Sequence, residues 1–193
     1  MDKGIGKGDT FAIYMRNHPE FICGMMAGVT IGAIAVPVDP RNKGQRLKFL
    51  LNNCKARAVI VSGECLEDLE AVIADVPTLR FITVAYQPGQ NIAVSTKYHA
   101  LNEVMGKDTW KPVEQQIMDV RHPMQIIYTS GTTGDPKGVM IRNNRTGLFN
   151  ILNSIVWKYK SDDILYNGLS LTHGNAQAVT LFPALSLGIK AVF

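Results

Sequence analysis

The chain has 193 residues, of which 46% are hydrophobic and 19% are charged, and its formal net charge is +4. This balance excludes disordered, collagen-like and low-complexity proteins, because it supplies enough apolar side chains for a packed core. The positive charge suits small anionic ligands, but the Lys and Arg residues are too scattered for a dedicated nucleic-acid-binding protein.

Cysteine usage and the N-terminal residues predict a cytoplasmic protein. Cys23, Cys54 and Cys65 are an odd number, lie far apart and form no C-x-x-C pair, so they predict neither disulfides nor a zinc site. We expect them to be buried and unreactive. The N-terminus contains no apolar signal-peptide segment. The uncharged run Phe21–Val38 approaches the length of a membrane span, but its glycines and Pro37 favour a buried helix followed by a buried strand.

The first part of the chain alternates between predicted strands and predicted helices. Asn17, Pro19 and Glu20 mark a helix start with a capping side chain, a proline in the first turn and an acid near the positive end. Apolar residues after Gly44 recur at positions i, i+3, i+4 and i+7, which predicts an amphipathic helix. The predicted strands are 10–16, 33–38, 58–61 and 81–84, and the predicted helices are 17–31, 44–54 and 66–73. This alternation predicts an α/β fold with a mostly parallel sheet flanked by helices.

Residues 87–122 break this rhythm and predict an irregular connection with one short helix. After it, predicted strands at 124–129 and 139–141 flank a glycine-rich loop. A long helix that ends near Tyr159 follows, with Asn143 or Asn144 as its cap. The remaining predicted elements are strands at 165–171 and 190–193 and a helix at 176–187.

The segment Ile127–Val139 carries the chemical signal. It leads from a strand into a loop with three glycines, four hydroxyl side chains and one lysine. Glycines let backbone N–H groups approach an anion closely, and hydroxyl donors rotate to suit it. Lys137 adds a positive charge for phosphate oxygens, and Pro136 stiffens the approach. This composition is typical of a polyphosphate-binding loop.

Other well-known motifs do not match. A Walker A loop needs G-x-x-x-x-G-K-[ST] before a helix, whereas Pro136 replaces the second glycine here and a strand follows. The glycines of residues 4–8 lead into a strand rather than a helix, so they are not a dinucleotide fingerprint. Residues 168–172 fail the G-x-S-x-G pattern of serine hydrolases at the last position.

Residues Tyr128–Val139 (YTSGTTGDPKGV) resemble the signature loop of the adenylate-forming superfamily over all twelve positions. This superfamily includes acyl-CoA synthetases, peptide-synthetase adenylation domains and firefly luciferase. Val29–Pro40 (VTIGAIAVPVDP) is similar to its conserved helix–strand junction, and Leu169–Gln177 (LSLTHGNAQ) to its acid-pocket segment. The resemblance implies that residues 1–193 are part of the large N-terminal AMP-binding domain, incomplete at both ends and without the mobile C-terminal domain.

The resemblance also implies an acyl-CoA synthetase that uses ATP and Mg²⁺ to convert a carboxylic acid into an acyl-adenylate and then transfers the acyl group to CoA. Its small-molecule partners would be the acid and CoA, as in fatty acid metabolism. The residues implied to bind phosphate are Thr129, Ser130, Gly131, Thr132, Thr133, Gly134, Lys137 and Gly138. The residues implied to bind the acid are His173, Gly174 and Asn175.

The acid-pocket segment bears on the substrate. Thr172–His173 supplies no carboxylate for a substrate ammonium group, so an amino acid is disfavoured and a fatty-acyl or carnitine-type acid is indicated. The alternative for His173 is a hydrogen-bonded core histidine. Arg142–Asn143 stands where the family has Ser/Thr–His, so any role of that histidine is absent.

The family's adenine- and magnesium-binding motif, ribose-binding Asp and catalytic lysine lie beyond residue 193, so we expect no catalytic residue and no metal ligand in this chain. Two functions stay open: part of an acyl-CoA synthetase, or an inactive polyphosphate-binding remnant or subunit completed by a second chain. We also expect the last strand to form an unpaired apolar edge that favours self-association. The residues expected beside that edge are Leu181, Phe182, Leu185, Ile189, Val192 and Phe193.

Overall fold

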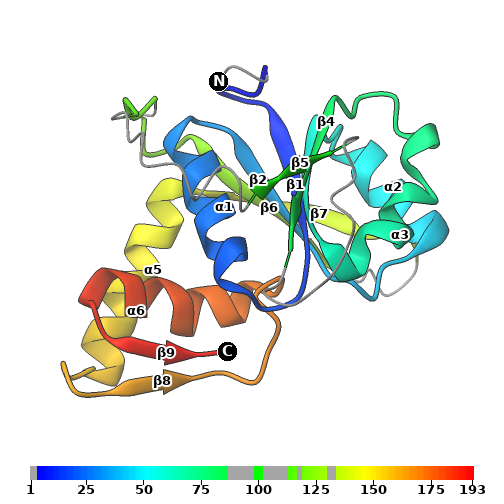
Figure 1. Cartoon of the computed structure of the whole chain (residues 1–193). Helices are drawn as coiled ribbons and strands as arrows, with labels where there is room; N and C mark the ends of the chain where they lie inside the picture. The colour runs from blue at the N-terminus through cyan, green and yellow to red at the C-terminus, as the bar shows by residue number, and fades with distance from the viewer. Residues whose placement is uncertain (1–3, 87–97, 102–112, 117–118, 130–133) are drawn as a thin grey trace.

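The computed structural model (Figure 1) describes residues 4–86, 98–101, 113–116, 119–129 and 134–193. Most of the connection predicted between 87 and 122, with its short helix, lies outside these residues. Among the helices of the described residues, none is long and apolar enough to cross a membrane. The uncharged run Phe21–Val38 instead forms most of one helix and the strand after it, as predicted.

A seven-stranded sheet forms the centre of the described structure, in the order β5-β4-β3-β1-β2-β6-β7. Its neighbouring strands are parallel except for β6 and β7, which are antiparallel. The predicted α/β fold with a mostly parallel sheet is confirmed. The strands are β1 (Thr10–Tyr14), β2 (Ile34–Val38), β3 (Ala58–Ser62), β4 (Phe81–Ala85), β5 (His99–Ala100), β6 (Pro123–Thr129) and β7 (Lys137–Arg142).

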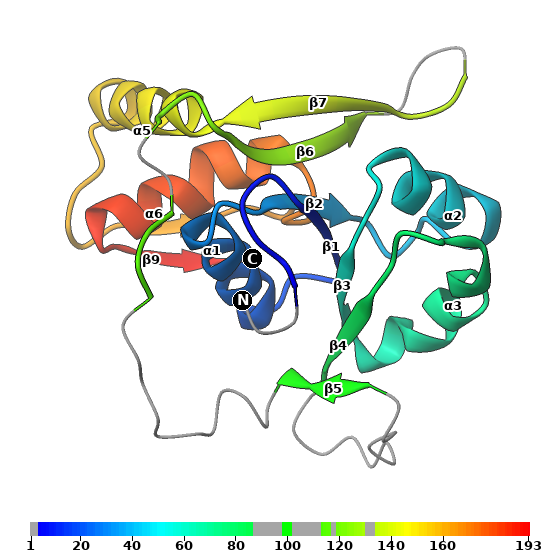
Figure 2. The same ribbon diagram turned by 90° about the horizontal axis from the view of Figure 1, so that it is seen from above.

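Helices cover both faces of this sheet. Figure 2 shows α1 on one side of the central strands, and α2 and α3 on the other. The helices of the first part are α1 (Pro19–Thr30), α2 (Gly44–Asn53) and α3 (Leu66–Glu70), with 3₁₀ turns η1 (Gly63–Cys65) and η2 (Ile73–Asp75). The second part contains α5 (Asn143–Trp157), the π-helical turn η3 (Ala176–Leu181), α6 (Phe182–Leu187) and a two-stranded parallel sheet of β8 (Ile164–Tyr166) and β9 (Lys190–Val192).

Alternation along the central strands divides the core into two clusters. Ala12 and Tyr14 of β1 face the α2 side, where Leu47, Leu50 and Leu51 are buried. The odd-numbered residues of β1 face the α1 side, with Phe21 and Met25 of α1. Because both faces are covered, β1 and β2 are nearly continuous apolar segments, as is usual for parallel strands. Cys54 and Cys65 are buried as expected, whereas Cys23 is exposed, so the expectation was wrong for Cys23.

Two local predictions fail, one because of a contact far away in the chain and one because of a turn close by. Asn17 does not cap α1, since its side-chain amide donates to the carbonyl of Leu169 and its oxygen accepts from the N–H of Leu171. The strand predicted over 165–171 ends at Tyr166, because Asn167 accepts a hydrogen bond from the N–H of Leu169 and starts a turn.

The predicted helix 176–187 is present, but its first part is a π-helical turn. Pro183 has no N–H to donate to the carbonyl of Val179, and the hydroxyl of Tyr159 donates to that carbonyl instead, at 3.1 Å. Asn153 donates to the neighbouring carbonyl of Ala178 at 2.7 Å. The proline therefore accounts for the wider turn, and Asn153 of α5 and Tyr159 just after α5 supply hydrogen bonds to these carbonyls.

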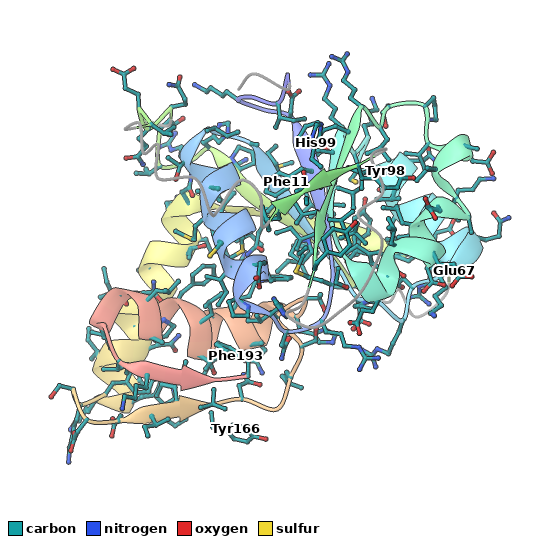
Figure 3. All side chains as sticks on the ribbon, in the orientation of Figure 1. Phe11, Glu67, Tyr98, His99, Tyr166 and Phe193 are labelled. Atoms are coloured by element: carbon teal, nitrogen blue, oxygen red, sulfur yellow. The ribbon has the colours of Figure 1, made fainter. Side chains whose placement is uncertain are left out.

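The last strand is not part of the large sheet. β9 pairs with β8 alone, in a separate two-stranded sheet, so its other side has no partner strand among the described residues. Of the residues expected beside it, Leu181 and Phe182 are buried. Figure 3 places Tyr166 and Phe193 on this side of the molecule, far from Tyr98 and His99 at β5. Self-association through β9 stays a prediction.

Close packing of α1 on the sheet depends on Gly28. A Cβ atom at this position would lie 2.2 Å from two ring atoms of Phe11. We predict that Gly28→Ala lowers the free energy of unfolding by about 1–3 kcal/mol, through overpacking against β1. Gly147→Ala in α5 is the matched control, because its Cβ would meet nothing within 4 Å. Urea denaturation of both variants checks this, and equal stability of the two would contradict it.

Candidate functional site

The two ends of the glycine-rich loop are held together by β6 and β7. Thr129 pairs with Lys137 and Tyr128 with Gly138, and the Thr129 hydroxyl donates to the carbonyl of Lys137 at 3.5 Å. Of the predicted phosphate-binding residues, Thr129, Gly134, Lys137 and Gly138 are described, and all four are exposed. Ser130, Gly131, Thr132 and Thr133 lie outside the described residues.

Gly138 has a packing role in this hairpin. A Cβ atom there would lie 2.8 Å from Cγ2 of Ile126 and 3.3 Å from the ring of Tyr128. The Tyr128 hydroxyl donates to Oδ1 of Asn53 at 2.5 Å, which ties the hairpin to the end of α2. Burial raises the pKa of Tyr128 to about 12, so this phenol is protonated at neutral pH and can donate.

A cavity of about 620 Å³ lies beside the hairpin, and we call it the loop cavity. It is at the carboxyl ends of the adjacent parallel strands β2 and β6, where ligands commonly bind in α/β proteins. Four segments line it: the hairpin, the end of β2 with the connection that follows it, α2, and the turn before η3. The polar residues among them include Asp39, Arg41, Asn42, Arg46, Thr129, Thr172, His173 and Asn175.

Asp39 organises the floor of this cavity. It accepts hydrogen bonds from Nε and Nη2 of Arg41 at 3.0 and 2.8 Å, and from the Arg41 N–H at 2.9 Å. The hydroxyl of Thr172 donates to Oδ2 at 3.5 Å, and Nε2 of His173 lies 4.0 Å from the same oxygen. The hydrogen bonds from Arg41 lower the pKa of Asp39 against the opposing effect of burial, so the carboxylate is ionised at neutral pH.

His173 reaches this floor from the opposite segment. Its side chain is 49% exposed, so the alternative of a core histidine is wrong. Gly174 and Asn175 line the same cavity, together with Thr129 of the loop stem. The structure therefore brings the predicted acid-pocket residues next to the predicted phosphate loop. Arg41 and Arg46 were not predicted as site residues, although Arg41 directly follows the V-P-V-D-P segment that the sequence singles out.

The described residues fit a phosphate group but not a metal ion. Lys137, Arg41 and Arg46 are cationic side chains around the loop and its cavity, and the Thr129 hydroxyl is a further donor. Asp39 is the one carboxylate among the described residues that line the cavity. Within the described part of the chain, no group of three His, Cys, Asp or Glu side chains could hold Mg²⁺.

The fold is that of an α/β domain with a cavity at the carboxyl ends of its parallel strands, and comparison with known proteins defines the family. The model of the AMP-binding enzyme family matches residues 1–193, so the chain belongs to this family of adenylate-forming enzymes. An acetyl-coenzyme A synthetase of Pseudoalteromonas atlantica is 31% identical over 98% of this chain and 31% of its own length. A crotonobetaine/carnitine–CoA ligase of a Proteus species is 26% identical over 98% of this chain and 36% of its own length. The chain thus spans about a third of these curated relatives.

Solved structures show the same fold. The crystal structure of an anthranilate CoA ligase in complex with anthranoyl-AMP superposes with a TM-score of 0.85 at 23% identity, over 98% of this chain and 36% of that one. A long-chain-fatty-acid–CoA ligase from Archaeoglobus fulgidus gives a TM-score of 0.84 at 19% identity, over 99% of this chain and 36% of that one.

Stability should depend on pH through Asp39. Its pKa is lower in the folded than in the unfolded chain, so the ionised carboxylate stabilises the fold above about pH 4 and this contribution is lost as the pH falls through the folded value. We predict that the parent has a higher free energy of unfolding than Asp39→Asn at neutral pH. This difference should shrink as the pH falls from about 5 to about 3. Denaturation at a series of pH values measures it. In Arg41→Ala the pKa of Asp39 should rise, and an unchanged carboxyl titration by NMR would refute this account.

Proposed function

We propose that the chain carries the phosphate-binding loop and part of the acid pocket of an ATP-dependent acyl-CoA synthetase. The supporting observation is the loop cavity, in which the stem of the signature loop and the His173–Asn175 segment share one volume at the carboxyl ends of β2 and β6. Such a cavity suits two reactants that must meet, a polyphosphate and a carboxylic acid. Residues 1–193 would be part of the N-terminal AMP-binding domain of a cytoplasmic enzyme, without its mobile C-terminal domain.

In this proposal the chain's residues position the reactants and stabilise charge. Lys137 and the loop residues hold the β- and γ-phosphates, and His173, Gly174 and Asn175 line the place of the acid. ATP supplies the α-phosphate that the carboxylate oxygen attacks, and pyrophosphate leaves. Asp39 keeps Arg41 in place and faces His173, so both side chains stay at the cavity floor. We assign no described residue to Mg²⁺, to CoA or to a covalent step, and we expect the chain alone to be inactive.

The acid is proposed to lack an α-ammonium group and to be of the fatty-acyl or carnitine type. Thr172 and His173 provide no carboxylate for an ammonium, and Asp39 is already engaged by Arg41 through two hydrogen bonds. The names of the matched relatives, which include acetyl and crotonobetaine/carnitine acids, agree with a non-amino acid.

Lys137→Ala should reduce acid-dependent pyrophosphate release by roughly ten- to a hundredfold, in protein expressed from the complete coding sequence. A charge-assisted hydrogen bond to phosphate contributes about 1.5–3 kcal/mol. Lys190→Ala is the matched control, since this lysine is also exposed but lies on β9, in the separate two-stranded sheet and not in the hairpin that holds the signature loop. Equal rates of pyrophosphate release for the two variants, both shown to be folded by circular dichroism, would contradict the proposal that this loop binds phosphate.

His173→Ala should change the preference among acids more than the affinity for ATP, because His173 belongs to the acid-side segment of the cavity. We expect unequal losses of kcat/KM across a panel of acids, with little change in Tm because the side chain is half exposed. Uniform losses for every acid would contradict a role in the acid pocket.

A further inference from the structure

A second cavity, of about 250 Å³, adjoins the loop cavity. Ile127, Gly174 and Asn175 line both volumes, so the two cavities meet at these residues. The second cavity extends along β6 toward α5 and the helical segment after Asn175, where Ala178 and Phe182 line it. Its position makes it the extension of the proposed acid pocket, away from the phosphate loop.

Gln125 is a buried polar residue in the lining of this second cavity. Its side chain is 2% exposed, and Oε1 is buried without a hydrogen-bond partner. The backbone is fixed, because Gln125 pairs with Ala35 of β2 on one side and Ile141 of β7 on the other. Burial of an amide without a partner is unfavourable, so most buried polar groups in proteins are paired. Gln125 also lines the second cavity, so a ligand that reaches the amide there can supply the missing hydrogen bond to its oxygen.

The spacing along β6 defines the length of that ligand. Gln125, Ile127 and Thr129 alternate on one face of the strand, and residues two apart are separated by about 7 Å. Thr129 lines only the loop cavity, Ile127 lines both, and Gln125 lines only the second. An acid whose carboxylate lies near Ile127 would reach the Gln125 amide with a chain of roughly four to six carbons.

We propose that Gln125 is a specificity residue, and that the second cavity takes the tail of a short carboxylic acid with a neutral hydrogen-bond donor, such as a hydroxyl. This inference rests on the proposed function, since it places the acid at the junction of the two cavities. The unpaired atom of Gln125 is its amide oxygen, which accepts a hydrogen bond, so the group that pairs with it has to donate one. No carboxylate lines the cavity among the described residues, so none of them would pair with a cationic tail. Of the two types of acid proposed above, this favours the fatty-acyl type over the cationic carnitine type.

Paired acids test this specificity in protein expressed from the complete coding sequence. Linear acids of four, five and six carbons are compared with their terminal hydroxy acids by pyrophosphate release. The parent should prefer a hydroxy acid by roughly tenfold or more in kcat/KM, because a plain chain leaves the buried amide unpaired. Gln125→Met keeps the side-chain length without the amide, and should abolish this preference through loss of activity on the hydroxy acid alone. Preference of the parent for plain acids, or equal losses for both acids in the variant, would overturn the proposal.

Two further measurements separate this proposal from the proposed function. Gly174→Ala places a Cβ atom 3.1 Å from Cδ1 of Ile127, so it should narrow the junction and impair the longer acids relative to acetate, with or without a hydroxyl. The rise in Tm on addition of each acid reports binding without turnover, and should favour the hydroxy acid in the parent but not in Gln125→Met. Absence of pyrophosphate release with every acid would refute the proposed function, and the Tm comparison would still decide the role of Gln125. If Gln125→Met fails to fold, the parent's own preference decides.

Discussion

The parallel alignment of β2 with β6 is the constraint on which the candidate site depends. Ala35 and Gln125 pair across these strands, and Asp39 and Thr129 each follow four residues later. The residues that leave the two strands therefore emerge at the same level of one sheet edge. The β2–α2 connection brings Asp39 and Arg41 to this edge, and the β6–β7 hairpin brings the signature loop. A shift of one residue between the strands would separate these groups and turn the side chains of β2 to the opposite face.

Packing on both faces fixes that alignment. β2 is buried along its whole length, and β1 beside it is covered by α1 on one face and α2 on the other. α1 can lie this close because Gly24 and Gly28 leave space for Ile60 and Phe11. The sheet under the site is thus rigid, whereas the cavity walls are built from connections and from the ends of elements. Specificity can change in such walls without a change in the core.

Patterns within a few residues were sufficient to predict most elements of the first part. The helix around the leucines at 47, 50 and 51 follows from the helical hydrophobic period, and the strands of residues 10–85 follow from short apolar segments between the helices. Asn17 could not be assigned in this way, because its partners Leu169 and Leu171 lie more than 150 residues away. The π-helical turn had a readable signal in Pro183, which interrupts an otherwise helical segment.

The candidate site, too, could be predicted from the sequence only in part. The loop and the His173–Asn175 segment are visible as motifs, but their meeting with Asp39 and Arg41 depends on strand order, which no local pattern contains. Gln125 was visible as a polar residue inside an apolar strand, yet its meaning needs the cavity beside it.

The two ends of the proposed pocket face different physical demands. At the loop end the donors and cations proposed to bind phosphate are exposed, and the phosphates that they would hold are the same for every acid, so these groups would not discriminate between acids. Discrimination has to arise where the acid's tail is desolvated, and β6 leads from Thr129 to such a place at Gln125. An unpaired buried amide costs about 1–3 kcal/mol, a large share of the 5–15 kcal/mol that is typical of domain stability. An apolar residue at that position would pack against Ile141 and Phe182 without this cost. A ligand that pairs the amide offsets the cost, and a plain chain does not, so the same residue that weakens the empty fold can select the substrate.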